Sequence, residues 1–125
     1  MFKFIFALLL LSTSAVADDW RPADTYRETA FQVLNVIDWG QTRYIARHPD
    51  QFYEKNLANG GSAEFIGVHP TTGRVDVYMA QSAVLHFAVA YLLPHDWRDA
   101  FQYITIAGKL NATVNNASIG IKVGF

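Results

Sequence analysis

Apolar residues recur at the three- to four-residue spacing of an α-helix in three stretches of the chain. We expect helices over about residues 25–47, 73–93 and 96–115. Pro49 and Pro94 end the first two, and residues 49–73 form a long loop rich in Gly, Asn, Pro and Ser. The last residues, SIGIKVGF, alternate apolar residues with small or polar ones, as an extended segment does. The pattern predicts an all-α fold: a three-helix bundle with a long central loop and a short extended C-terminal tail.

Local signals place the starts of these helices. Thr25 followed three residues later by Glu28 matches a capping box, which predicts that the first helix begins at Thr25. A threonine of the pair Thr71-Thr72 is expected to cap the second helix, and Asp96 the third.

The N-terminal residues resemble a signal peptide. Lys3 precedes an unbroken apolar run, Phe4–Leu11, and Ala15-Val16-Ala17 matches the small-residue cleavage pattern. The run is shorter than the roughly 20 apolar residues that a spanning helix needs, which favours cleavage over a retained anchor. We expect residues 1–17 to be removed and residues 18–125 to form a single helical domain.

Polar residues follow one line along the first helix. At steps of three and four residues the line contains Glu28, Gln32, Asn35, Asp38 and Thr42. The third helix carries a comparable line of Gln102, Thr105, Lys109, Thr113 (or Ala112) and Asn116. If the first line faces solvent, these are ordinary surface residues. If it faces inward, Asp38 must be paired, because burying an unpaired carboxylate costs too much free energy.

Several polar residues could form a site where the helices meet. The candidate cluster is Asp38, Thr42, Glu54, Asn56, His69, His86 and Asn115. As an enzymatic or small-ligand site, Asp38 and His86 would act as base and partner, Thr42 and Asn115 would orient the ligand, and Glu54 would enter from the loop. An antiparallel arrangement could also bring Lys109 to Asp38 and His86. The alternative reading is a set of helix–helix hydrogen bonds and turn residues without chemistry of their own.

Composition excludes several kinds of function. The chain has no cysteine, so it forms no disulfides and no thiol or cysteine–zinc site. Its net charge of −1 comes without any basic run, so no nucleic-acid partner is expected. The sequence contains no zinc-protease, serine-hydrolase, P-loop or dinucleotide-binding motif. We therefore expect no metal and no cofactor, and we favour a role without catalysis.

The second helix raises the question of a membrane. Its middle, VYMAQSAVLHFAVAYLL, is an apolar stretch about 26 Å long at 1.5 Å per residue, close to the hydrocarbon thickness of a bilayer. The other two helices would bring Asp38, Arg43 and Lys109 into the membrane. Composition alone favours a soluble periplasmic bundle. Such a bundle would bury Phe31, Leu34, Ile37, Leu85, Val89, Leu92, Phe101, Ile104 and Leu110.

Short motifs resemble a group of small bacterial and phage proteins described as membrane or exported proteins, with no assigned activity. Their pattern reads Asp-Trp-x-x-Thr, Glu-x-Asn-Pro, Gly-x-His-Pro, an apolar helix with a histidine, and a late asparagine. The matching positions are Asp38, Trp39, Thr42, Glu54, Asn56, His69, Pro70, His86 and Asn115. This chain departs from the pattern at Leu57, where the proline would stand, and in a Gly- and Ser-rich insert before His69. The resemblance implies membrane association and supplies no activity.

The sequence as a whole indicates an exported cell-envelope protein of structural or interaction type, without catalysis. It would be periplasmic or associated with the inner membrane, facing the periplasm, and its partner would be an envelope protein or the membrane. Two alternatives stay open. One is an enzymatic or small-ligand site built on Asp38 and His86. The other is a membrane-embedded helical bundle.

Overall fold

A computed structural model describes residues 19–125. The expected signal peptide and its cleavage after Ala17 lie outside these residues. The described chain is all-helical, with long helices close to the expected ranges. The elements are α2 (Pro22–Arg47), the 3₁₀ turn η1 (Leu57–Asn59), α3 (Ala63–Ile66), α4 (Thr72–Leu92) and α5 (His95–Ser118).

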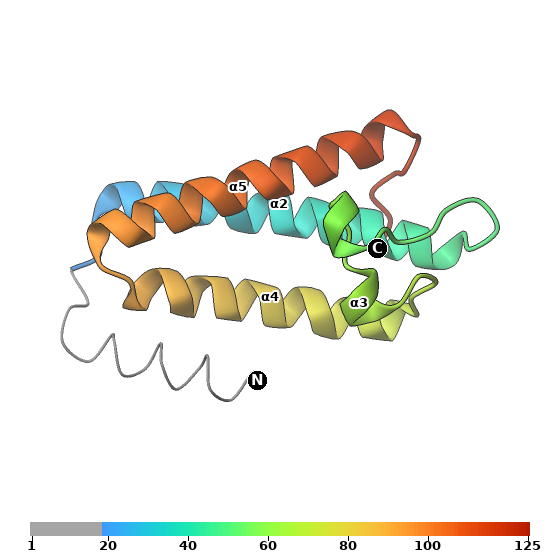
Figure 1. Ribbon diagram of the computed structural model, residues 1–125, viewed down its shortest axis with the longest axis horizontal. Coiled ribbons are helices and arrows are strands. Elements are labelled where there is room, and N and C mark those ends of the chain that lie inside the picture. The colour runs from blue at the N-terminus through green and yellow to red at the C-terminus, as the bar shows by residue number, and fades with distance from the viewer. Residues whose placement is uncertain (1–18) are drawn as a thin grey trace.

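The central helix is α2, which packs against both α4 and α5 (Figure 1). At one end of the molecule, which we call the turn end, α2 begins and Leu93-Pro94 joins α4 to α5. At the other, the loop end, α2 and α5 end and α4 begins. The loop with η1 and α3 lies at the loop end, and α3 contacts α4 (Figure 1).

The capping-box prediction for the first helix is wrong. Helix α2 begins at Pro22, whose fixed φ and missing N–H suit the first helical position. The backbone N–H of Arg21 donates to the Asp24 carboxylate at 2.8 Å. Thr25 instead accepts a hydrogen bond from the Trp20 indole at 2.7 Å, which leaves Glu28 free to turn inward.

The other two helix starts agree more closely with the sequence. Thr71 caps α4, its hydroxyl accepting from the Arg74 N–H at 3.2 Å, as expected of that threonine pair. Helix α5 starts directly after Pro94, so Asp96 lies in the first turn rather than at the cap. A carboxylate there still interacts favourably with the helix dipole.

The C-terminal tail is extended, as expected, and is held against α2. The Gly124 N–H donates to the Gly40 carbonyl at 3.0 Å, and the Arg47 guanidinium donates to the Phe125 carbonyl at 3.1 Å. A Cβ at Gly40 would lie 2.4 Å from a Val123 methyl. Position 40 therefore needs glycine, so that the tail can cross the helix.

A small cluster of buried apolar side chains lies at the loop end. It contains Ile66, Val75 and Met79, with Trp39 and Tyr78 packed against it. Fully burying a side chain of this size contributes about 1.5–3 kcal/mol. This cluster connects the loop to α4, and Phe31 and Ala90 are buried further along the helices.

The core expected for a soluble bundle is formed only in part. Of its nine residues Phe31 is buried and five are half-buried, but Leu85, Ile104 and Leu110 are 50%, 71% and 50% exposed. The helices are rotated so that these apolar side chains point outward and the polar lines point inward.

Candidate functional site

The polar line of α2 faces the interior. Glu28, Asn35 and Thr42 are 6%, 1% and 3% exposed. The polar line of α5 faces it, with Gln102 and Thr113 buried as well. Of the two orientations that the sequence left open, the structure has the inward one.

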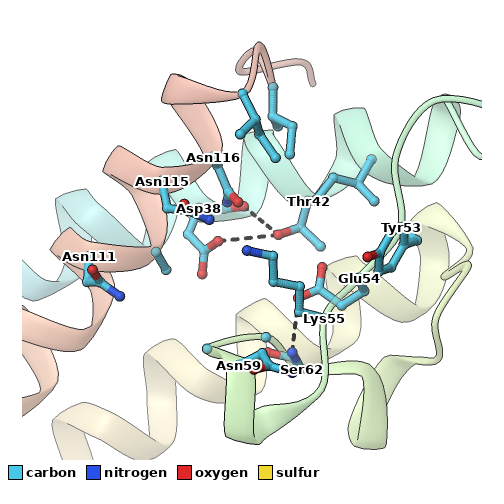
Figure 2. Close-up of a pocket in the computed structure, with 16 residues that line it drawn as sticks. Asp38, Thr42, Tyr53, Glu54, Lys55, Asn59, Ser62, Asn111, Asn115 and Asn116 are labelled. Carbon is cyan, nitrogen blue, oxygen red and sulfur yellow. Dashed lines mark hydrogen bonds between the residues drawn. The ribbon is translucent and has the colours of Figure 1, made fainter.

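These lines end in a pocket at the loop end, between α2, α5 and the central loop (Figure 2). The pocket has a volume of about 60 Å³, which is room for a few water molecules or a small ion. Four of the seven candidate residues line it: Asp38, Thr42, Glu54 and Asn115.

An ion pair lies at the inner end of the pocket. The Lys109 ammonium donates to Asp38 Oδ2 at 2.6 Å, and both side chains are largely buried. The Thr42 hydroxyl donates to the Asp38 carbonyl at 2.7 Å and lies 3.3 Å from its carboxylate. Asp38 is therefore paired, as an inward orientation requires.

Glu54 brings a second carboxylate into the pocket from the loop. Its Oε1 accepts the Ser62 N–H at 2.9 Å. Burial raises the pKa of this carboxyl above its ordinary 4.5, and the nearby negative charge of Asp38 raises it further. The Ser62 hydrogen bond and the charges of Lys109 and Lys55 act in the opposite direction. Figure 2 shows Lys55 entering the pocket from the same loop.

The loop reaches the pocket through a tight backbone turn. The N–H groups of Gly61 and Ala63 donate to the carbonyls of Asn56 and Lys55 at 2.9 Å each. A Cβ at Gly61 would lie 2.0 Å from the Lys55 carbonyl oxygen, so only glycine fits. The Gly-rich insert thus closes the loop onto itself.

His86 belongs to a different part of the interior, so the expected Asp38–His86 pair is not formed. Its Nδ1 lies 3.0 Å from Glu28 Oε1, and its Nε2 lies 2.7 Å from the Thr105 hydroxyl. The imidazole stacks on Phe31 with ring centroids 3.4 Å apart. The capping-box prediction assigned the Glu28 side chain to the start of the first helix. Glu28 was therefore not expected as the partner of His86.

The two remaining candidates are loop residues outside the pocket. Asn56 caps η1, its side chain accepting the Asn59 N–H at 2.9 Å. His69 is exposed before α4. In contrast, Asn111, Asn116 and Lys55 line the pocket without having been singled out as candidates. Asn116 already belongs to the polar line of α5, and its place on that line was the signal that could have identified it.

Within residues 19–125 no three His, Asp or Glu side chains are grouped closely enough to hold a metal ion. The pocket offers hydrogen-bond acceptors, amides and ammonium groups, so it can bind water, protons or a small polar molecule. The chain matches no protein-family model, no curated protein and no solved structure.

Proposed function

We propose that this chain is an exported protein of the cell envelope whose long helices form a three-helix bundle embedded in the membrane. In this proposal it acts as a structural or interaction protein and not as a catalyst. One observation carries the proposal: away from their ends, the helices keep charged side chains inside and expose mostly apolar ones.

The exposed charges of the long helices lie at helix ends. In α2, α4 and α5, all within the described residues, the charged residues with exposed side chains are Arg47, Arg74, Asp76, Asp96 and Asp99. Each lies in the first two turns or the last turn of its helix. Between those turns the exposed side chains are apolar or uncharged. The largest are Tyr26, Val33, Val36, Val77, Val84, Leu85, Phe87, Tyr91, Tyr103, Ile104, Leu110 and Val114.

The interior has the opposite character. Each charged side chain between the helix ends has a hydrogen-bonding partner, including Asp24 with Arg98, Glu28 with His86 and Asp38 with Lys109. In a membrane, lipid favours apolar side chains on the outside, and polar side chains join helices inside. A protein folded in water buries most of its apolar side chains and exposes most of its charged ones.

Helix lengths and aromatic positions support the same proposal. At 1.5 Å per residue, α4 is about 31 Å long and the other two are longer, enough for a hydrocarbon core of about 30 Å. Helix α4 is long and apolar enough to cross a membrane, and only 22% of its most apolar stretch is buried. Exposed Tyr26, Tyr91 and Trp97 gather at the turn end, where an interfacial aromatic belt would lie.

Charge also predicts an orientation. Exposed Arg47, Arg74 and Lys122 lie at the loop end beside exposed Asp50 and Glu64, whereas the exposed charged residues at the turn end are acidic, Asp19 and Asp96. Because cytoplasmic segments carry more Lys and Arg, we place the loop end in the cytoplasm and the turn end in the periplasm. A signal segment with Lys3 inside would deliver residue 18 to the periplasm, next to the start of α2.

Fractionation tests the membrane proposal. The full chain should remain in carbonate-washed membranes and require detergent for extraction. Release with the osmotic-shock fluid would overturn the proposal. Because the chain has no cysteine, single cysteines test the orientation: Asp96→Cys should react with an impermeant maleimide added outside, and Ala58→Cys only after lysis. The reverse result would invert the orientation.

A matched pair of substitutions separates lipid from water as the solvent of α4. Val84 is 69% exposed in mid-helix, and Val68 is 51% exposed in the loop. In a bilayer, Val84→Lys should cost about 2.5–3.5 kcal/mol of insertion free energy, measured as the inserted fraction of the chain. Val68→Lys should be neutral, within about 0.5 kcal/mol. Equal effects of the two substitutions would contradict the membrane proposal.

A small-ligand site is a second candidate function, favoured by the pocket. It brings Asp38, Glu54 and Asn115 around one cavity. Isothermal titration with small polar amines and amides tests it, and binding should disappear in Asp38→Asn.

A further inference from the structure

Helix α4 carries a regular line of side chains on the face that points away from α2. At alternating steps of four and three residues this line, which we call the α4 seam, contains Val77, Gln81, Val84, Ala88 and Tyr91. Ala88 is partly exposed and the other four residues are exposed. Alternating steps of four and three repeat every seven residues, which is the spacing along which two helices pack as a left-handed coiled coil.

Gln81 is the polar position of this seam. It stands next to Ser82, the middle residue of α4, so a bilayer that α4 spans would place its side chain near the centre of the hydrocarbon. Its exposed amide makes no hydrogen bond within residues 19–125, whereas the Ser82 hydroxyl donates to the Tyr78 carbonyl at 2.8 Å. Moving an unpaired amide from water into an apolar medium is unfavourable. The Gln81 amide therefore needs a partner outside the described residues.

The surface around Gln81 has room for another helix. Helix α4 packs mainly against α2 (Figure 1), and only 22% of its most apolar stretch is buried. Beside the seam lies a shallow groove between α3 and α4, whose lining includes Phe65, Gly73, Val77 and Gln81. A groove of this kind can receive side chains of a neighbouring helix, as holes receive knobs in a coiled coil.

We propose that the chain forms a dimer in the membrane, in which two α4 helices pack along their seams and the two Gln81 amides hydrogen-bond to each other. The inference rests on the proposed membrane embedding and names the partner that the interaction role left open. The partner is a second copy because the amide is self-complementary. Each glutamine side chain offers both a donor and an acceptor, so two of them at a two-fold axis satisfy each other.

Membrane insertion fixes how the two copies meet. Copies inserted in the same direction are related by a two-fold axis along the membrane normal, so their α4 helices run parallel and equivalent residues lie at the same depth. Gln81 of one copy then faces Gln81 of the other. The rest of the seam suits close packing, because Val77 and Val84 are compact, Ala88 is small and no charged side chain stands in the seam. A single polar residue in an apolar seam fixes the register of the pair.

Disulfide cross-linking tests the direction of the seam. The chain has no cysteine, so single cysteines can be compared. Val84 and Leu85 are neighbours at the same depth and are 69% and 50% exposed, but only Val84 belongs to the seam. The full chain is reconstituted at a low protein-to-lipid ratio and oxidised with iodine. We expect most of Val84→Cys to become a disulfide-linked pair of chains, and little of Leu85→Cys.

A second measurement tests the amide. Gln81→Leu keeps the size of the side chain and removes its hydrogen bonds, and energy transfer between labelled chains in vesicles reports the dissociation constant of the dimer. We expect this constant to rise about 3- to 30-fold, as for hydrogen bonds between membrane helices. Thr29→Val is the matched control, because it removes an exposed polar group from α2, outside the seam. It should leave the constant unchanged.

Each other outcome overturns the dimer. Equal cross-linking of Val84→Cys and Leu85→Cys indicates random collision. A dissociation constant that Gln81→Leu leaves unchanged removes the role of the amide. In native membranes, cross-linking of Val84→Cys to a protein of a different mass identifies another partner. A monomer in which neither cysteine cross-links leaves the seam to lipid or to the N-terminal segment. Flotation separates these results from the membrane proposal: a chain that does not float with vesicles refutes both, and one that floats as a monomer refutes only the dimer.

Discussion

The two ends of the polar interior differ in how completely their charges are enclosed. At the turn end, Asp24 and Arg98 are paired at 2.8 Å with both side chains 0% exposed. Asp24 also accepts from Arg21 and Arg27. At the loop end, Asp38 and Lys109 are paired at 2.6 Å with side chains 13% and 17% exposed, and Asp38 lines a pocket.

This difference separates a structural role from a chemical one. The carboxylate of Asp24 is held by three guanidinium groups, which cannot give up a proton under ordinary conditions. The Asp38–Lys109 pair has a polar cavity beside it and a second carboxylate, Glu54, in that cavity. The turn end therefore holds fully enclosed ion pairs, whereas the loop end has a polar cavity beside its ion pair.

Removing a cation at the turn end should have the largest effect. Arg98→Met would leave one side of the buried Asp24 carboxylate without its partner, and three carbonyl contacts, to Asp19, Ala90 and Tyr91, would also be lost. We expect a loss of about 3–5 kcal/mol in the free energy of unfolding. The measurement is denaturation in detergent micelles followed by far-ultraviolet circular dichroism. A loss below that of Lys109→Met would reverse our assignment of the two ends.

The corresponding change at the loop end should cost less. Lys109→Met removes the cation next to Asp38, but the pocket admits water that can solvate the carboxylate. We expect a loss of about 1.5–3 kcal/mol, the range for a hydrogen bond to a charged group. The same denaturation measurement checks it. A double-mutant cycle with Asp38→Asn should recover most of the loss, since the uncompensated charge is then gone.

The helices and their polar lines could be predicted from the sequence, but the direction of the lines could not. The spacing of Glu28, Asn35 and Thr42 fixes a common face of a helix whether that face meets water or another helix. The outward positions of Leu85 and Ile104 show why: an apolar face is buried in protein in water and exposed to lipid in a membrane, and its pattern is the same in both cases.

The site itself could be predicted only in part. Asp38, Thr42, Glu54 and Asn115 were singled out and meet in one pocket. The partner of His86 depends on helix rotation and on the start of α2, which Pro22 places three residues before the expected Thr25. Contacts made when the loop folds back on itself leave no recognisable pattern in the sequence. The close approach of Gly61 to the Lys55 carbonyl is one example.

Opening the loop should have a smaller and more local effect than breaking an ion pair. In Gly61→Ala the new methyl group would collide with the Lys55 carbonyl, at 2.0 Å for an unshifted backbone. We expect a cost of about 1–3 kcal/mol, typical of overpacking. Hydrogen exchange should show it as faster exchange of the Gly61 and Ala63 amides. Gly73→Ala is the control, because a Cβ there meets nothing within 4 Å. Equal exchange rates in both variants would show that the loop is not held at Gly61.

The smallest change should be Glu54→Gln, and it tests the loop end through pH. The pKa of Glu54 is raised in the folded protein, chiefly by burial, so the folded state resists ionisation more than the unfolded state does. The unfolded protein therefore loses this proton first as pH rises above about 4.5, and the wild-type free energy of unfolding should fall through that interval until Glu54 ionises in the folded state too. Glutamine has no proton to lose and can still accept the Ser62 N–H, so the fall attributable to Glu54 should disappear.

Glu64→Gln is the matched control on the same loop, since Glu64 is exposed. If the free energy of unfolding of Glu54→Gln depends on pH as that of the wild type does, the Glu54 carboxylate is as well solvated in the pocket as in the unfolded chain. The pocket would then not enclose it.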